Sequence, residues 1–563
     1  MRALVHGYDG RPYVVVGDTV FFSNAADHRV YRQQGATAPV AFSTTVNRRY
    51  ADGCYDEGRR RLLYVREKSA TESGLVENAI VAISIDDPKT EQVIVPSPTG
   101  NPCVEFYAAP RLSPDGQLLA WIFWKHPAMP WTESTLCFGK IRADGMVTDV
   151  QTVAGGPGVS ILQPEWSPQG TLHYLSNETN WWNIYRWDGQ RSRAVTQIDA
   201  EIGAPLWHLG ASYYAFSPAG GIAFTLNELG VWSLAVVGAD GCIRRIETPF
   251  QDCGFVSVLG NEIVCVAGAP DRPKAVVAID MANGAVREIR ASTTIPAELL
   301  PYVSVPVVKR FGSAAGFYYA PRNSDFQPAP NEIPPLIVNC HGGPTAAASS
   351  AISLAVQFWT SRGFAYFDLN YRGSNGYGRD YMNQIKESWG VVDVEDAVSA
   401  AQGLADAGLA DRRRMIIRGG SAGGYTALAA LAFHDTFQAG GSYYGIGNLE
   451  MLLDTHKFEM HYLDWLVGEY PAQKDLYIER SPVHAAARMT APVIFLQGED
   501  DTVVLPKQSA EMSEALRSRG ILFAYLLFAG EGHGFRKAST IVRALEAELN
   551  FYTTALLHGR LRY

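Results

Sequence analysis

The 563-residue sequence predicts two parts of different architecture, an all-β propeller followed by a doubly wound, mainly parallel α/β sheet. Two observations predict this division. In the N-terminal half, short β-type runs are separated by turns of one kind that recur at a regular spacing. In the C-terminal half, apolar strand-like runs alternate with helical stretches. We place the boundary near residue 295, so that residues 1–295 form the propeller and 296–563 the α/β domain.

The repeating turn is the strongest signal in the N-terminal half. Its glycines are Gly58, Gly116, Gly170 and Gly220, which are 58, 54 and 50 residues apart. A strand-rich unit that recurs at about this period is typical of a propeller blade, because one blade cannot bury both of its faces and must stack on its neighbours. The length of chain before the boundary accommodates about six to seven blades.

In the C-terminal half, a run rich in small residues, 418–425, joins a strand-like stretch to a helix-like stretch. It follows the strand-like stretch 415–417 and precedes the helix-like stretch 426–433. Gly419, Ser421 and Gly423 occupy the fixed positions of the G-x-S-x-G nucleophile elbow of α/β hydrolases. The glycines are needed because the sharp strand-to-helix turn leaves no room for side chains beside the serine. Ser421 is therefore the predicted nucleophile.

The partners of a serine nucleophile follow it in the order that this fold demands, the acid before the histidine. An apolar strand-like run at 493–498 ends in an acidic cluster, and a second at 526–528 leads to His533 between two glycines. In such a triad, the histidine takes the serine proton and the carboxylate orients the imidazole. The residues alone leave Asp500 and Asp501 open as the acid, with Glu499 a poorer third.

An oxyanion-binding loop is predicted before the elbow, where the apolar run 335–340 ends in His-Gly-Gly-Pro. A turn of this type presents backbone N–H groups to the anion that forms on the attacked carbonyl. The expected donors are the amides of Gly343 and Ala422, the second of which directly follows the nucleophile.

Together these stretches resemble the prolyl oligopeptidase family of serine peptidases, specifically its acylaminoacyl-peptidase and dipeptidyl-peptidase-like bacterial branch. The matching stretches, in chain order, are His341-Gly-Gly-Pro, 370–378, Trp389-Gly390 before Asp393 and Asp396, 419–424, 455–459 and Gly532-His-Gly534. Alignment to the family's acid motif without gaps places the catalytic aspartate at Asp501. Val503 departs from the pattern, since members usually have Arg or Asn at that position.

The resemblance implies that the propeller covers the active site and admits only small or unstructured peptides. Family members usually carry a longer N-terminal stretch, so the ring is expected to be incomplete or unusually closed. An exopeptidase would also need a carboxylate for the substrate's free amine, because that charge is costly to bury unpaired. Candidates are Glu201 and Glu178, although each fits an ordinary loop acid better. Tyr443 is a candidate for the acyl pocket, with aromatic packing an equal alternative.

Composition excludes several other classes of function. A net charge of −9 argues against a nucleic-acid partner, which would call for a basic face. Seven cysteines without a C-x-x-C pair are typical of a reducing compartment, and no apolar stretch is long enough for a membrane span. We therefore expect a cytoplasmic protein with no metal and no cofactor, and the sequence leaves homo-oligomer formation open.

The leading prediction is a serine peptidase that acts on short peptides, as an exopeptidase or oligopeptidase, through an acyl-enzyme intermediate. Its partner would be a peptide or a small acyl substrate. Two alternatives stay open at this stage. One is an esterase, amidase or acyltransferase on the same catalytic scaffold, and the other is a non-catalytic propeller binding protein.

Overall fold

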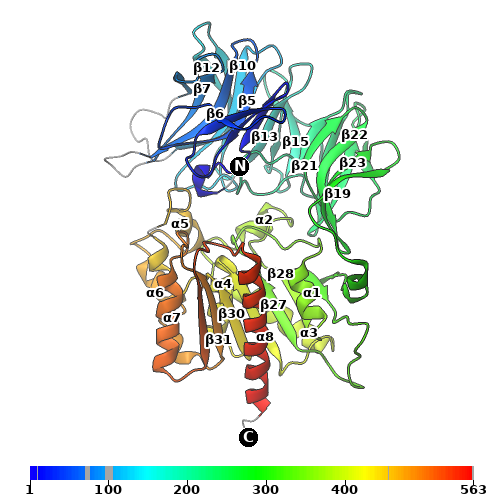
Figure 1. Cartoon of the computed structure of the whole chain (residues 1–563), viewed down its shortest axis with the longest axis vertical. Helices are drawn as coiled ribbons and strands as arrows, with labels where there is room; N and C mark the ends of the chain where they lie inside the picture. Colours follow the sequence, from blue (N-terminus) through cyan, green and yellow to red (C-terminus); the bar gives the residue numbers. More distant parts are fainter. Residues whose placement is uncertain (9, 70–75, 96–104, 454, 561–563) are drawn as a thin grey trace.

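Figure 1 shows the computed structural model, which describes the chain except for residues 9, 70–75, 96–104, 454 and 561–563. The N-terminal half forms a group of small β-sheets, and the C-terminal half forms one large sheet covered by helices. The β-sheets of the N-terminal half lie over one end of the large sheet (Figure 1). None of the described helices has the combination of length and apolar character that a membrane crossing needs.

Six four-stranded antiparallel sheets, one per blade, make up the N-terminal half, and this confirms the predicted propeller. The blades in chain order are β1 (Tyr13–Val16), β2 (Thr19–Ser23), β3 (Val30–Gln34), β4 (Val40–Ala41); β5 (Arg48–Asp56), β6 (Arg61–Ser69), β7 (Val76–Ser84), β8 (Glu91–Val95); β9 (Glu105–Leu112), β10 (Leu118–Lys125), β11 (Thr135–Ile141), β12 (Val147–Gly155); β13 (Ile161–Trp166), β14 (Leu172–Ser176), β15 (Asn183–Trp187), β16 (Ser192–Ala194); β17 (Tyr214–Phe216), β18 (Ile222–Glu228), β19 (Val231–Val237), β20 (Ile243–Ile246); β21 (Asp252–Leu259), β22 (Glu262–Ala269), β23 (Arg272–Asp280) and β24 (Val286–Ala291).

The repeating turn occupies the same place in successive blades, between the first and second strands. Gly116, Gly170 and Gly220 have φ of 66°, 81° and 91°, a conformation that glycine adopts without strain. The amide of each glycine donates to the carbonyl of the serine three residues earlier, at 2.8–2.9 Å. The regular spacing of the glycines in the sequence thus reflects the repeat of one hairpin. Among the described residues, no strand of the first blade pairs with a strand of the sixth.

The C-terminal half contains an eight-stranded sheet in the order β25-β26-β28-β27-β29-β30-β31-β32. The pairs β25–β26 and β26–β28 are antiparallel, and the pairs from β28 to β32 are parallel. The strands are β25 (Val307–Phe311), β26 (Ala314–Tyr319), β27 (Leu336–Cys340), β28 (Ala365–Asn370), β29 (Met415–Gly420), β30 (Ala439–Tyr443), β31 (Val493–Gly498) and β32 (Phe523–Phe528). This confirms the doubly wound, mainly parallel sheet and the α/β-hydrolase fold.

Helices follow most of the parallel strands and cover both faces of the sheet (Figure 1). The α-helices are α1 (Leu354–Thr360), α2 (Arg379–Asn383), α3 (Val392–Asp406), α4 (Ala422–Phe433), α5 (Tyr462–Leu466), α6 (Lys474–Arg480), α7 (Pro506–Ser518) and α8 (Ala538–Arg560), and the 3-10 helices are Val5–Gly7, Ala297–Tyr302, Glu450–Leu452 and Ala486–Arg488. Helix α4 is buried along nearly its whole length, since it is rich in alanine and packs closely on β29 and β30.

The propeller contacts the C-terminal half through loops at the carboxyl ends of the sheet strands. His126 Nε2 lies 2.9 Å from the carbonyl of Lys457, and Arg379 donates to the carbonyl of Gly158 at 3.0 Å. The Tyr8 hydroxyl, from the segment before the first blade, donates to Glu459. The propeller thus covers the same edge of the sheet from which the loops of the candidate site arise.

Candidate active site

Ser421 lies at the sharp turn between β29 and α4 in a backbone conformation that few residues adopt. Its φ is 56° and its ψ is −124°, and its amide donates to the carbonyl of Tyr443 at 3.0 Å. A Cβ at position 419 would lie 2.3 Å from the Gly423 oxygen, and one at position 423 would lie 2.0 Å from the Cys340 oxygen. Both positions therefore accept only glycine, which is the reason for the G-x-S-x-G pattern.

The three residues predicted for the triad lie in one hydrogen-bonded row. His533 Nε2 is 3.0 Å from the hydroxyl oxygen of Ser421, and His533 Nδ1 is 2.9 Å from Oδ2 of Asp501. Asp501 follows β31 and His533 follows β32, so each of the three side chains comes from the end of a different parallel strand. Residues 112 positions apart in the chain thus meet at one edge of the sheet.

Four donors hold the carboxylate of Asp501 in place. Its Oδ1 accepts the backbone amides of Val503 and Val504 at 2.9 and 3.0 Å, and its Oδ2 accepts Gln497 Nε2 at 3.2 Å besides His533. The side chain of Asp501 is fully buried. The other two candidates for the acid, residues 499 and 500, are exposed, so the structure brings only Asp501 to the histidine.

The loop that carries His533 is fixed by a buried acid that the sequence analysis did not identify. Glu531 accepts the amides of Arg536 and Lys537, both at 2.9 Å. These two bonds close the turn from β32 to α8 around the histidine. The glycines on either side of His533 drew attention in the sequence, whereas the acid two residues before it resembles any other loop acid.

Gly343 and Ala422, whose amides are the predicted oxyanion donors, line one small cavity together with Ser421. Within the described part of the chain, neither amide donates to a protein acceptor. A Cβ at position 343 would lie 2.7 Å from the backbone nitrogens of Thr345 and Ala346, so the tight turn there requires glycine. The loop is held by His341, whose Nε2 lies 2.6 Å from the hydroxyl of Ser374.

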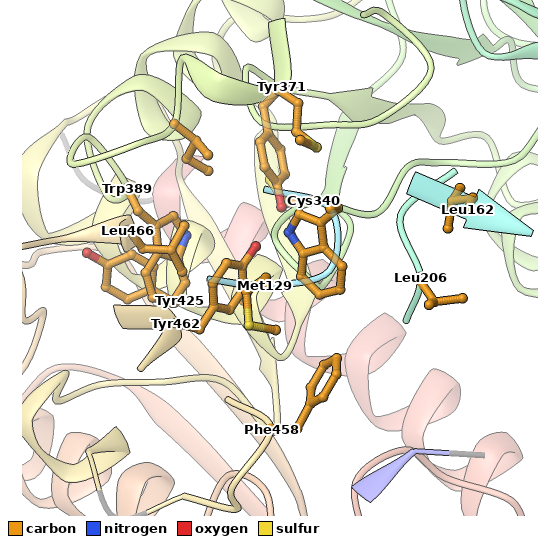
Figure 2. Packing of buried hydrophobic residues seen from close by; sticks show 14 of the residues in the cluster. Met129, Leu162, Leu206, Cys340, Tyr371, Trp389, Tyr425, Phe458, Tyr462 and Leu466 are labelled. Atoms are coloured by element: carbon orange, nitrogen blue, oxygen red, sulfur yellow. The ribbon is translucent and has the colours of Figure 1, made fainter. Parts of the chain in front are cut away.

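Two cavities meet at Ser421, which among the described residues is the one that lines both. The first has a volume of about 30 Å³ and is mostly apolar, and the second has a volume of about 450 Å³. The first is lined by Gly343, Pro344, Trp389, Ser421, Ala422, Ile446, Leu452, Thr455, Glu459, Tyr462, Leu463, Leu466, Val503 and Val504. Figure 2 shows Trp389, Tyr462, Leu466 and the nearby Phe458 in the packed cluster around this cavity.

The second cavity runs from Ser421 past Tyr444 toward Arg418, which is on β29. The Arg418 guanidinium lies over the ring of Tyr443 and pairs with the buried Glu548 at 3.3 Å. The Glu548 carboxylate also accepts the hydroxyls of Tyr443 and Tyr552, at 2.5 and 2.8 Å. The buried Arg418 Nε and Nη1 have no hydrogen-bond partner among the described residues. Arg418 escaped the sequence analysis because it lies inside a strand, just before the elbow.

Of the three predicted substrate-binding side chains, the structure brings only Tyr443 to a cavity beside Ser421, and that is the second cavity. Glu201 is buried, lines neither cavity, and accepts the amides of Trp182 and Gly378 at 2.8 and 3.1 Å. Burial raises the pKa of Glu201 to about 7. Glu201 therefore joins the propeller to the loop before α2. Glu178, the other candidate acid, lies exposed at the surface.

Glu459 lines the first cavity, a position that its local sequence does not indicate. Its Oε1 accepts the hydroxyl of Tyr8 at 2.5 Å. The pKa of Tyr8 lies well above its usual value, mainly because the side chain is buried and also because Glu459 is its neighbour. The stretch 455–459 was noted only for its resemblance to the family, and nothing in its composition distinguishes this acid from the others.

The fold and the site define an α/β hydrolase with a serine at its nucleophile elbow and a propeller cap. The model of the prolyl oligopeptidase family matches residues 350–558. A puromycin-hydrolyzing peptidase of Mycobacterium tuberculosis is 37% identical, with a TM-score of 0.92 over 99% of this chain and 88% of that one. A solved puromycin hydrolase is 33% identical, with a TM-score of 0.92 over 98% of this chain and 87% of that one.

Among curated relatives, dipeptidyl aminopeptidase BIII of Pseudoxanthomonas mexicana is 31% identical over 233 residues. That alignment covers 40% of this chain and 34% of the relative, so the match spans about a third of the relative's length. The chain belongs to the prolyl oligopeptidase family. This confirms the family, the fold class and the class of enzyme that the sequence predicts, a serine peptidase of the prolyl oligopeptidase type.

Proposed function

We propose that the chain hydrolyses short peptides by a Ser421–His533–Asp501 triad. The observation that carries this proposal is the row of two hydrogen bonds, 3.0 and 2.9 Å long, that joins the three side chains. Both distances are within the range in which a histidine can take a proton from serine while a carboxylate orients it. The puromycin-hydrolysing relatives with 33% and 37% identity support a small substrate of this kind.

The reaction begins when Ser421 Oγ attacks the substrate carbonyl carbon and its proton passes to His533 Nε2. Asp501 stabilises the imidazolium that forms, and the amides of Gly343 and Ala422 donate to the oxyanion. As the amide C–N bond breaks, His533 returns the proton to the leaving amine, and the acyl group stays on Ser421. Water then attacks the ester through the same histidine, which releases the acid and restores the serine.

The two cavities correspond to the two sides of the scissile bond. The first cavity contains both predicted oxyanion donors, so we assign it to the acyl part of the substrate. The second contains Tyr444 and Phe535, and the ring of Tyr444 lies 4.8 Å from that of His533. Because His533 protonates the leaving amine, the second cavity is the place for the leaving group.

The propeller affects the size of the substrate. Its position over the strand ends favours short or unstructured peptides.

The proposed domain boundary near residue 295 is supported by the end of the last propeller strand at Ala291 and the start of β25 at Val307. A cytoplasmic location and a homo-oligomer stay predictions from the sequence.

Replacement of Ser421 by alanine tests the proposal. Ser421→Ala is expected to abolish turnover of aminoacyl p-nitroanilides while circular dichroism and the unfolding midpoint stay unchanged. Ser518→Ala, in an exposed serine of α7, is the matched control and should keep full activity. Residual turnover by Ser421→Ala within tenfold of the parent enzyme would remove Ser421 from its role as the nucleophile.

A further inference from the structure

Glu459 lines the first cavity, which we assign to the acyl part of the substrate. Among the described residues, its carboxylate has no permanently charged partner. Its side chain is 14% exposed and accepts the Tyr8 hydroxyl. Among the described residues, its nearest basic group is His456 Nε2 at 3.8 Å, and no lysine or arginine pairs with it. The adjacent Lys457 instead donates to the carbonyl of Val76 at 2.9 Å. A largely buried carboxylate that has no lysine or arginine partner is stabilised best by a cationic group of the substrate.

Aromatic rings surround this part of the cavity wall. Tyr462 lines the cavity, and its ring lies 5.6 Å from Trp131, which in turn lies 4.2 Å from Trp207. The ring of Tyr8 lies 5.6 Å from Trp207 and 5.8 Å from Phe458. Ring faces attract cations, most strongly where water is excluded. A carboxylate among aromatic rings is therefore a site for an ammonium group.

We propose that Glu459 binds the free α-ammonium group of the residue whose carbonyl Ser421 attacks, which makes the enzyme an aminopeptidase. This inference rests on the proposed function of the triad. The two residues line the same small cavity, so the amine and the attacked carbonyl belong to one residue rather than to the two ends of a dipeptide. The bond that breaks is the first peptide bond, and the products are one free amino acid and the shortened peptide.

The rest of the cavity wall indicates which first residue fits. Leu463, Leu466 and Val504 supply an apolar surface, and Val503 stands where family members usually have Arg or Asn. An apolar side chain gains from burial against this wall, whereas a charged one would lose its hydration without a partner. The enzyme is therefore expected to prefer an apolar N-terminal residue.

Glu459→Gln tests the role of the carboxylate, because glutamine keeps the size of the side chain and an oxygen for the Tyr8 hydroxyl. The matched control is Glu499→Gln, which neutralises an exposed acid near Asp501 that lines neither cavity. Leucine p-nitroanilide and N-acetyl-leucine p-nitroanilide differ only in the α-amine. Covalent labelling by a fluorophosphonate, which has no amine, reports on the fold and on Ser421 in each variant.

The parent enzyme and Glu499→Gln are expected to turn over the free amine at least about 100-fold better than the acetylated substrate. Glu459→Gln should lower kcat/KM for the free amine about 100-fold, mainly through KM, because an amine placed opposite a neutral amide loses its charge partner. Its turnover of the acetylated substrate and its labelling rate should stay within threefold of the parent values. With an unblocked tetrapeptide, mass spectrometry should detect a single released residue.

Equal turnover of the two anilides by the parent enzyme, an unchanged KM in Glu459→Gln, or the release of dipeptides would each overturn the inference while leaving the triad intact. Absence of both anilide turnover and labelling in the parent enzyme would instead refute the proposed function, and the inference with it.

Discussion

Asp501→Asn is expected to lower kcat by about four orders of magnitude while the fold is retained. In the present structure, Oδ1 of Asp501 accepts two backbone amides and Oδ2 accepts His533. Backbone amides can only donate, so the oxygen of an asparagine has to take the Oδ1 position and its NH₂ group then faces His533 Nδ1. His533 must accept there and carry its proton on Nε2, so it can no longer take the proton of Ser421. A factor of about 10⁴ corresponds to roughly 5.5 kcal/mol of transition-state stabilisation.

The assay is kcat for an aminoacyl p-nitroanilide, with the thermal midpoint as the test of folding. Asp500→Asn is the matched control, because Asp500 is exposed and next to Asp501 in the chain. It should keep kcat within twofold. A loss of less than tenfold in folded Asp501→Asn would show that the orientation of His533 does not depend on this carboxylate, and would refute the reasoning.

Three further predictions concern stability. Gly423→Ala should destabilise the fold by about 3 kcal/mol or more, because the new Cβ would lie 2.0 Å from the Cys340 oxygen. The control Gly254→Ala, where the Cβ would meet open space, should leave the free energy of unfolding nearly unchanged in the same urea titration. Arg418→Met should cost about 3–5 kcal/mol by leaving the buried Glu548 uncompensated, and the double variant with Glu548→Gln should recover most of it; a single-variant loss below 1 kcal/mol would contradict this. The folded-state pKa of Glu201 is raised to about 7, so its protonated form favours folding below about pH 4.5, and that contribution is lost as the pH rises to 7. Glu201→Gln should therefore gain stability relative to the parent over this range, and parallel pH profiles would contradict the assignment.

The features that sequence predicted well are those with a local physical cause. In the third, fourth and fifth blades the turn depends on a glycine with positive φ, so the spacing of Gly116, Gly170 and Gly220 shows the repeat directly, whereas Gly58 in the second blade is not in that conformation. The elbow depends on Gly419 and Gly423, which lie within two residues of Ser421 and leave no room for a side chain. The glycine pair around His533 then indicated the histidine, whereas the residues alone left Asp500 and Asp501 open and only alignment to the family's acid motif selected Asp501.

The substrate-binding acids could not be predicted in this way, because they depend on contacts between distant parts of the chain. Glu201 was a candidate for the carboxylate that an exopeptidase needs for the free amine, but its two oxygens hold backbone amides at the interface between the propeller and the hydrolase domain. Glu459 becomes noticeable only because the N-terminal segment places Tyr8 against it, 451 residues away in the sequence. Pairings of this kind leave no local pattern that the sequence could reveal.

The most direct test of the whole account is to treat the intact protein with a fluorophosphonate and map the modified residue by mass spectrometry. Three side chains from separate strand ends would make a single hydroxyl reactive, so one adduct per chain is predicted, at Ser421, with labelling abolished by His533→Ala. A protein that stays unlabelled, or that carries its adduct on another residue, would contradict the account.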